Sequence, residues 1–232
     1  MITRVWNVQR KVGWDMSHVH LALPQAALAG GFRGCSGRLV DFCQRGDFAI
    51  GALPEDGGLF TFEGSRALGF GEDGGSFSLA PETPVLTGAA ATLAPPDAVK
   101  EVVCPAGANQ FVTLLSALMP SPNFAYALRV EGHFERVRTT AQFGPEAPAC
   151  PVRTWENVRG MLLGFYFPSW LESMAWAGCR FHFLSEDRAV GGRLVDCETV
   201  RSVVALRHLT ECRVGIPGTA DFQLADFHGE RG

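Results

Sequence analysis

Lysine is nearly missing from this sequence of 232 residues: only Lys11 and Lys100 occur among its 20 basic residues, and arginine makes up the rest. A Schiff-base mechanism needs a desolvated lysine amine. These two lysines lie in a terminal and a linker-like setting, so we do not expect that chemistry. The formal net charge of −4 at pH 7 also excludes the basic coat that predicts a nucleic-acid partner.

Motifs for nucleotide binding and for a serine nucleophile are absent as well. Although the chain has 27 glycines, it contains no G-x-x-x-x-G-K-[ST], and no G-x-G-x-x-G opens a helix in a βαβ unit. No G-x-S-x-G elbow occurs either. The sequence therefore gives no support to either function.

Paired cysteine motifs and long apolar runs are missing too. The seven cysteines are odd in number, scattered and without a C-x-x-C, which argues against a disulfide framework or a structural zinc site. No stretch approaches the ~20 apolar residues that span a bilayer, and the N-terminal residues lack the apolar core of a signal peptide. We therefore expect a cytoplasmic protein with no membrane partner.

Glycine and proline are abundant instead, with 27 and 14 residues. Both exceed their average share and predict many tight turns, as in a β-rich fold. With 47% hydrophobic and only 19% charged residues, the chain is expected to fold rather than to remain disordered. Its length suits one large domain or two small ones.

Apolar patterning places the elements of the first half. Residues 1–23 predict one or two strands, and residues 25–45 predict partly helical structure with Ser36 as an N-cap. Between Asp47 and Pro84, short apolar runs cut by glycines predict a meander of antiparallel strands. The proline-containing stretch 93–106 predicts a linker.

A helix and further strands are expected after the linker. Apolar residues at helical spacing predict a helix over Phe111–Leu118 that stops at Pro120. Residues 126–140 and 161–167 predict strands, and residues 144–151 a loop. The result is an α+β fold with few helices and two sheet-containing lobes. We place an N-terminal β-rich lobe at 1–107 and a C-terminal lobe at 108–232.

The most informative segment is a predicted hairpin from Gly178 to Asp196, in which Gly191-Gly192 suits a connection that needs positive φ. Arg180 and His182 lie two residues apart on a strand and so share a face, which Arg193 of the return strand can reach. Two guanidiniums and an imidazole in one pocket would bind a carboxylate or stabilise an enolate oxygen. Alternatively, these residues are solvated on an exposed sheet face.

Collinear stretches give the chain a resemblance to the acetolactate decarboxylase family, from about Ala27 almost to the end. The stretches are Arg45-Gly-Asp-Phe-Ala-Ile-Gly51, Asp56-Gly57, the run Leu118–Gly132, Asn157-Val-Arg-Gly-Met-Leu-Leu-Gly-Phe165, and Ser185-Glu-Asp-Arg188 with Gly191-Gly192. The resemblance implies two lobes with a mixed sheet and a smaller curved antiparallel sheet. It also implies a homodimer, in which the aromatic run 165–176 could form the interface or, equally, belong to the core.

The resemblance further implies a zinc site that this sequence does not keep. In the family, a His-x-His pair and a third histidine after the Gly-Gly bind the ion, which holds the hydroxyl and carbonyl oxygens of the substrate. Here these positions are Arg180, His182 and Arg193, and Gly58 replaces an acidic residue. A catalytic zinc site needs about three protein ligands, and guanidiniums stay protonated. We therefore predict no metal and no other cofactor.

Other positions remain candidates for binding. An arginine that the family places in the strand after Tyr126 aligns with Thr140, two residues from Arg138, and we take Arg138, Arg129 and Glu131 as candidate substrate-binding residues. His18 and His20, also two residues apart, could join His182 in a relocated metal site or be ordinary strand residues. Glu230 is a poor substitute for a catalytic glutamate that the family carries near its C-terminus.

Two functions from different classes follow. The first is a metal-independent lyase or isomerase acting on a small keto or hydroxy carboxylate by decarboxylation or enolisation. Arg180 and Arg193 would bind the anion and stabilise the enolate, and His182 would transfer protons. The alternative is a non-catalytic pseudoenzyme that binds a small anionic metabolite or a protein partner, which Gly58 favours because a carboxylate is lost there.

Overall fold

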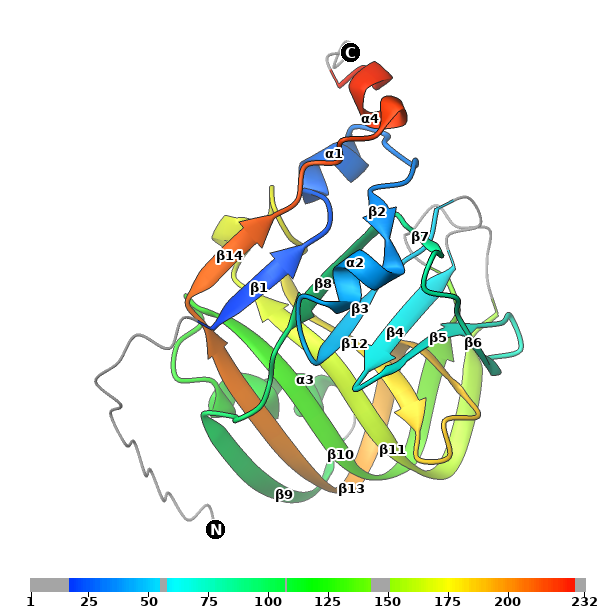
Figure 1. Ribbon diagram of the computed structural model, residues 1–232. Helices are drawn as coiled ribbons and strands as arrows, with labels where there is room; N and C mark the ends of the chain where they lie inside the picture. Colours follow the sequence, from blue (N-terminus) through cyan, green and yellow to red (C-terminus); the bar gives the residue numbers. More distant parts are fainter. Residues whose placement is uncertain (1–16, 55–57, 107, 143–150, 228–232) are drawn as a thin grey trace, which may run out of the picture.

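The computed structural model describes residues 17–54, 58–106, 108–142 and 151–227. Residues 1–16 of the range 1–23, where one or two strands are predicted, and nearly all of the loop predicted at 144–151 thus lie outside the described residues. The chain forms two large sheets and few helices (Figure 1), which confirms the predicted fold class. None of the described helices is long and apolar enough to cross a membrane.

The first large sheet has seven strands in the order β14-β1-β8-β3-β4-β5-β6. They are β1 (His18–Leu21), β3 (Phe48–Ala52), β4 (Leu59–Glu63), β5 (Arg66–Phe70), β6 (Ser76–Ser78), β8 (Thr87–Ala91) and β14 (Glu211–Val214). Consecutive antiparallel pairing from β3 to β6 confirms the predicted meander. The β1–β14 pair is parallel, so the sheet is mixed.

The second large sheet has five strands and is antiparallel throughout. They are β9 (Ala98–Ala106), β10 (Ala125–Thr140), β11 (Arg153–Phe167), β12 (Gly178–Ser185) and β13 (Gly191–Leu209). Strand β13 pairs with β9, β10 and β12, and Figure 1 shows the long strands curving strongly. Strands β2 (Gly37–Arg38) and β7 (Pro84–Val85) form a separate pair.

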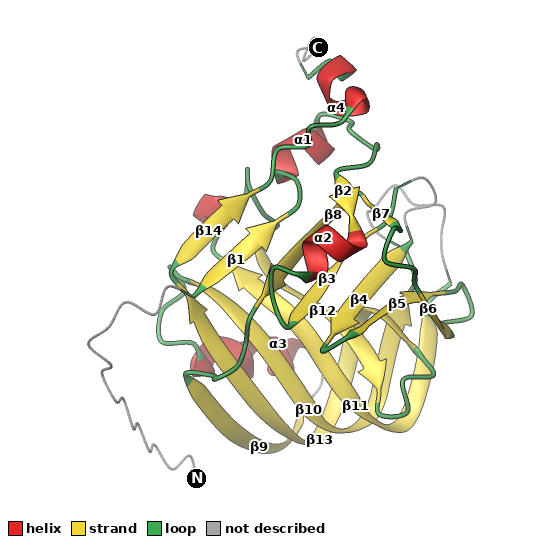
Figure 2. Cartoon of the chain, in the orientation of Figure 1, coloured by secondary structure: helices red, strands yellow, loops and turns green. Residues whose placement is uncertain are grey.

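One face of the five-stranded sheet is covered by helix α3 (Ala108–Leu118), which confirms the helix predicted from apolar spacing (Figure 2). Phe111 and Leu115 are buried there with Phe181 and Phe183 of β12. The other helical segments are short: α1 (Gln25–Ala29), α2 (Leu39–Cys43), η1 (Ser169–Leu171) and α4 (Ala220–Leu224).

The opposite face of the five-stranded sheet packs against the seven-stranded sheet. Phe48 of β3 and Phe165 of β11 stack with ring centroids 4.9 Å apart and planes 15° apart. Val19 and Ile50 are buried with them. Burial of such side chains contributes about 1.5–3 kcal/mol each, so this apolar seam fixes how the two sheets face each other.

Three local predictions are wrong. Strand β9 occupies most of the expected linker 93–106, because backbone pairing with β13 outweighs the local proline signal. Helix α2 begins after Arg38, and the Ser36 hydroxyl donates to the Val85 carbonyl (2.8 Å) instead of capping it. The glycine pair lies inside β13 and not in the turn, whose left-handed residue is Arg188, with φ 59°, although Gly192 does have the predicted positive φ, at 135°.

The predicted lobe boundary between residues 107 and 108 stays a prediction. The two sheets do not divide the chain at one point, since β9 joins the five-stranded sheet and β14 joins the seven-stranded sheet. Strand β11 begins at Arg153, earlier than the predicted residue 161. The sequence did not show this first half of the strand, because it is exposed and lacks the apolar run that marks the second half.

We expect Gly191→Ala to lower the free energy of unfolding by about 2–3 kcal/mol or more. A Cβ at Gly191 would lie 2.4 Å from the Phe183 carbonyl oxygen and 2.4 Å from a ring carbon of Phe70. Gly37→Ala is the control, because nothing lies within 4 Å of a Cβ there. Urea unfolding measures both variants, and equal stabilities would contradict the packing described.

Candidate functional site

The three residues singled out in the hairpin come together between the two large sheets. Arg193 of β13 is the register partner of His182 of β12, so both side chains leave the sheet on the same face. Phe181 and Phe183 pack on the α3 side. Arg180 and His182 therefore face the seven-stranded sheet, as the alternation along the strand predicts.

His182 is a buried, neutral residue in this arrangement. Its side chain is 2% exposed, and its Nδ1 lies 3.0 Å from Thr61 Oγ1 of β4. Burial, reinforced by the charges of Arg180 and Arg193, lowers the pKa of His182 to about 3, against a smaller opposing effect from a hydrogen bond to the Phe60 carbonyl. At neutral pH the imidazole is thus uncharged and cannot serve as a cationic acid.

The two arginines place positive charge beside this neutral ring. The Arg180 guanidinium lies 4.6 Å from the centroid of Trp176, a cation–π contact. Burial and the nearby Arg193 lower the pKa of Arg180 to about 10, and burial lowers the pKa of Arg193. Both remain protonated at pH 7, so the site is cationic.

Arg193 has no counter-charge within the part of the chain that the structure describes. It forms no salt bridge there, and its buried Nε has no hydrogen-bond partner. A buried charge that lacks a partner is costly. The site is therefore chemically complementary to an anion.

The other predicted binding residues, Arg129, Glu131 and Arg138, already form ion pairs within the protein. Arg129 contacts Glu63 (3.2 Å) and also pairs with Glu131. Arg138 pairs with Asp196 (2.8 Å), and a register shift separates it from the hairpin arginines. Their role in substrate binding stays a prediction, but their charges are neutralised within the protein, whereas Arg193 has no such partner among the described residues.

The structure does not bring His18 and His20 to His182. Both lie on β1, which is separated from β4 by β8 and β3, a spacing of roughly 14 Å at about 4.8 Å per strand. Burial, then Arg45, lowers the pKa of His20. The relocated metal site suggested by the sequence is thus not assembled among the described residues.

The donors around His182 do not fit a zinc ion. Two of the three positions that the resemblance assigns to ligands carry guanidiniums, which have no lone pair to offer when protonated. No cluster of three or more His, Cys, Asp or Glu side chains suited to a metal occurs in the described ranges.

Three residues of the site were missed from the sequence. Thr61 and Glu63 lie two apart on β4, and their polar side chains in an otherwise apolar strand, Leu59–Glu63, were a signal for a shared face. Trp176 had no such signal. Its contact with Arg180 depends on the path of the chain between η1 and β12.

The fold and the site define a class of protein: a mostly-β fold of two packed sheets with a cationic site between them. The family model described as alpha-acetolactate decarboxylase matches residues 24–229. The chain therefore belongs to the acetolactate decarboxylase family, as its sequence motifs predict.

Individual relatives agree with this assignment. The chain is 29% identical over 203 residues to the alpha-acetolactate decarboxylase of Bacillus subtilis (strain 168), covering 79% of this chain and 80% of the relative. It is 28% identical over 219 residues to that of Klebsiella aerogenes, covering 89% and 82%.

Solved structures show the same fold. The crystal structure of the Bacillus subtilis strain 168 enzyme matches with a TM-score of 0.83 and 24% identity, over 91% of this chain and 94% of that chain. A Staphylococcus aureus protein of unknown function, described as similar to alpha-acetolactate decarboxylase, matches with a TM-score of 0.81 and 17% identity, over 90% and 95%.

The segment named as a possible dimer interface divides into two parts. Phe165 and Phe167 are fully buried in the core between the sheets, whereas Trp170 and Met174 are exposed. The homodimer and the cytoplasmic location stay predictions.

As pH is lowered, we expect the free energy of unfolding to decrease more steeply in the native chain than in His182→Gln. The unfolded imidazole takes up a proton below its ordinary pKa of 6.5, whereas the folded one resists protonation down to about 3. Unfolding therefore takes up a proton in this window, and stability is lost as pH falls, by up to about 1.4 kcal/mol per pH unit. Denaturant unfolding between pH 6.5 and 4.5 measures this, with His133→Gln as a surface control. Parallel curves for the native chain and His182→Gln would contradict the buried, neutral state.

We expect the double variant Arg180→His, Arg193→His to bind about one zinc ion per chain, because three imidazoles would then share one face, as in a catalytic zinc site. The native chain and each single variant should bind far less. Elemental analysis after dialysis against zinc and then buffer measures the ratio. Binding of one zinc ion per native chain would contradict the conclusion that the donors around His182 do not fit zinc.

Proposed function

We propose that this member of the acetolactate decarboxylase family binds a small keto or hydroxy carboxylate between its two sheets and acts on it without a metal, as a lyase or isomerase. The observation that carries the proposal is the Arg180–Arg193 pair. Two guanidiniums lie beside a neutral imidazole, and Arg193 has no counter-ion among the described residues. A carboxylate or an enolate would supply the missing negative charge.

The chemistry follows from where negative charge develops. In decarboxylation of a β-keto acid, the bond to the carboxylate carbon breaks, carbon dioxide leaves, and the electron pair collects on the ketone oxygen as an enolate. Guanidiniums held in place before the reaction stabilise that oxygen most in the transition state. Enolisation transfers a proton from the carbon beside the ketone to a base, for which His182 is the candidate, and leaves the electron pair on the same oxygen, so both reactions use the same two guanidiniums. A proton delivered to carbon completes either reaction.

His182 has a narrower role than the sequence suggests. Because the pKa of His182 is lowered to about 3, it is neutral at pH 7 and a weak base. It can donate or accept a hydrogen bond while Thr61 fixes the ring. Proton transfer by His182 therefore depends on a bound anion, whose negative charge would raise the pKa of His182.

The same burial favours the alternative function, a non-catalytic binder of a small anion. A fully buried weak base is poorly suited to turnover, and Gly58 offers no carboxylate. Binding of an anion without a detectable product would select this alternative, because it needs only the charge of Arg180 and Arg193.

We expect Arg193→Gln to weaken binding of small carboxylates at least tenfold, because a hydrogen bond to a charged group contributes about 1.5–3 kcal/mol. Arg193→Lys should retain part of the affinity. Calorimetry with lactate, pyruvate and acetolactate measures binding, and mass spectrometry with carbon dioxide release detects turnover. Arg213→Gln is the control, since Arg213 is exposed on β14 and paired with Glu211. Unchanged affinity in Arg193→Gln would overturn the proposal.

A further inference from the structure

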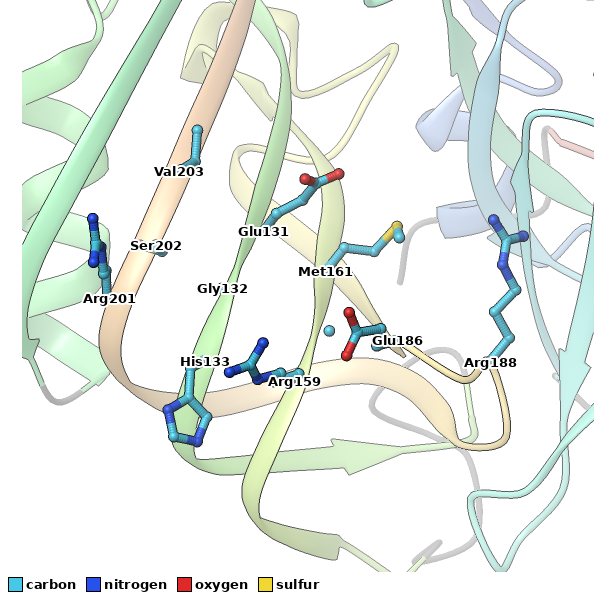
Figure 3. Close-up of a pocket in the computed structure, with 11 residues that line it drawn as sticks. Glu131, Gly132, His133, Arg159, Met161, Glu186, Arg188, Arg201, Ser202 and Val203 are labelled. Carbon is cyan, nitrogen blue, oxygen red and sulfur yellow. The ribbon is translucent and has the colours of Figure 1, made fainter.

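A cavity of about 490 Å³ on the five-stranded sheet differs in character from the inter-sheet site (Figure 3). Arg159 and Glu186, two charged residues that line it, are exposed, so water satisfies their charges. Buried polar groups, in contrast, find their partners within the protein. Thr61 and His182, which lie between the two large sheets and outside this cavity, are buried polar groups of that kind.

Thr61 places a hydroxyl where water does not reach. Its side chain is 1% exposed, and the backbone of β4 pairs with β3 on one side and with β5 on the other. The Thr61 Oγ1 lies 3.0 Å from the Nδ1 of His182, and this is the one hydrogen bond that the hydroxyl forms in the described part of the chain. The imidazole is therefore its partner.

The ring of His182 also depends on partners within the protein, because it is 2% exposed and uncharged at pH 7. A neutral imidazole has one N–H that donates and one nitrogen lone pair that accepts. The N–H donates to the Phe60 carbonyl. Two tautomers have to be compared, which differ in the ring nitrogen that carries the proton.

One of the two tautomers satisfies every group. With the proton on Nδ1, this N–H would serve both Phe60 and Thr61, and the Thr61 hydroxyl proton and the Nε2 lone pair would be buried without partners. With the proton on Nε2, the Thr61 hydroxyl donates to Nδ1 and the ring N–H serves Phe60. Among the described residues, neither Thr61 Oγ1 nor a ring nitrogen of His182 is a buried atom without a partner. Burial therefore favours the proton on Nε2.

Packing holds the ring in the orientation that this tautomer requires. The Phe70 ring lies edge-to-face with the His182 ring, with centroids 6.4 Å apart and planes at 81°. Gly191 leaves the space for Phe70, because a Cβ there would lie 2.4 Å from a Phe70 ring carbon. A flip of the imidazole would put a carbon in place of Nδ1 and break the bond to Thr61.

We propose that Thr61 is a positioning residue that fixes His182 in the tautomer with its proton on Nε2. In this tautomer the lone pair of Nδ1 is engaged by the Thr61 hydroxyl, so His182 has no free lone pair with which to take up a proton. The role of Thr61 follows from hydrogen bonding and burial and does not depend on the reaction.

The consequence for the chemistry rests on the function proposed above. Enolisation needs a base, and His182, the candidate, has no free lone pair in this tautomer. Decarboxylation of a β-keto acid breaks the bond to the carboxylate carbon without a base. Its electron pair moves to the ketone oxygen beside Arg180 and Arg193, and water then gives a proton to the carbon. The tautomer therefore favours decarboxylation over enolisation.

Nitrogen NMR of the native chain with isotope-labelled histidine tests the tautomer directly, because protonated and unprotonated ring nitrogens differ strongly in chemical shift. At pH 7 we expect His182 to show a protonated Nε2 and an unprotonated Nδ1, and His182→Gln assigns these signals by their loss. A protonated Nδ1, or equal amounts of the two tautomers, would overturn the proposal. This measurement needs no variant of Thr61.

Variants of Thr61 then test its role. Thr61→Val keeps the shape but removes the hydroxyl, and it should lower the ratio of the Nε2–H to the Nδ1–H tautomer about tenfold or more. Thr61→Ser keeps the hydroxyl and should restore the native ratio. Thr199→Val is the matched control, because Thr199 is also 1% exposed but its Oγ1 has no partner in the described ranges. A native ratio in Thr61→Val would overturn the role of Thr61.

Two substrates separate this inference from the proposed function. Exchange of the methyl hydrogens of pyruvate with deuterium from the solvent measures enolisation, and carbon dioxide release from acetoacetate measures decarboxylation. We expect the native chain to catalyse the release and not the exchange. Exchange that is catalysed by the native chain and lost in His182→Gln would overturn the inference about the base. If neither compound binds, the proposed function fails, whereas the NMR result still decides the role of Thr61.

Discussion

The position of the inter-sheet site depends on one carboxylate, that of Glu63, which joins the two large sheets. Glu63 of β4 is largely buried and contacts Arg129 of β10 and Arg188 of the hairpin turn. Backbone hydrogen bonds from Ser76 to Ala189 and from Gly191 to Gly74 hold the same turn against the β5–β6 connection. Charge-assisted bonds of this kind fix geometry as well as energy. They hold the hairpin that carries His182 against the strand that carries Thr61.

The electrostatics of the inter-sheet site follow from this docking. Once the sheets close, Arg180 and His182 leave water, which lowers the pKa of both. Desolvation of these two groups is unfavourable. In contrast, the arginines outside the site, Arg129 and Arg138, are neutralised by carboxylates. The resemblance to the family implies a divalent ion at this position, and in this chain the guanidiniums of Arg180 and Arg193 supply the positive charge there. They do so without the lone pairs that a metal needs.

Much of the fold was predictable because its signals are local. The glycine-cut apolar runs of the meander, the helical spacing of α3 and the alternation around His182 each depend on neighbours a few residues away. The linker prediction failed because β9 forms only through pairing with β13, far along the chain. The prediction that the glycine pair lies in the hairpin turn was wrong because the contact that requires Gly191 comes from a distant part of the chain. Gly191 is needed where a Cβ would meet Phe70 of another sheet.

The sequence by itself determined the family, the mostly-β class and the chemistry of the residues at the zinc positions, because these depend on residue type and order. It could not tell a solvated arginine from a buried one. Only the tertiary structure decided that Arg129 and Arg138 are neutralised, that Arg193 has no counter-charge in the described ranges, and that His182 is neutral. Charge compensation and desolvation depend on which distant side chains lie within a few ångströms.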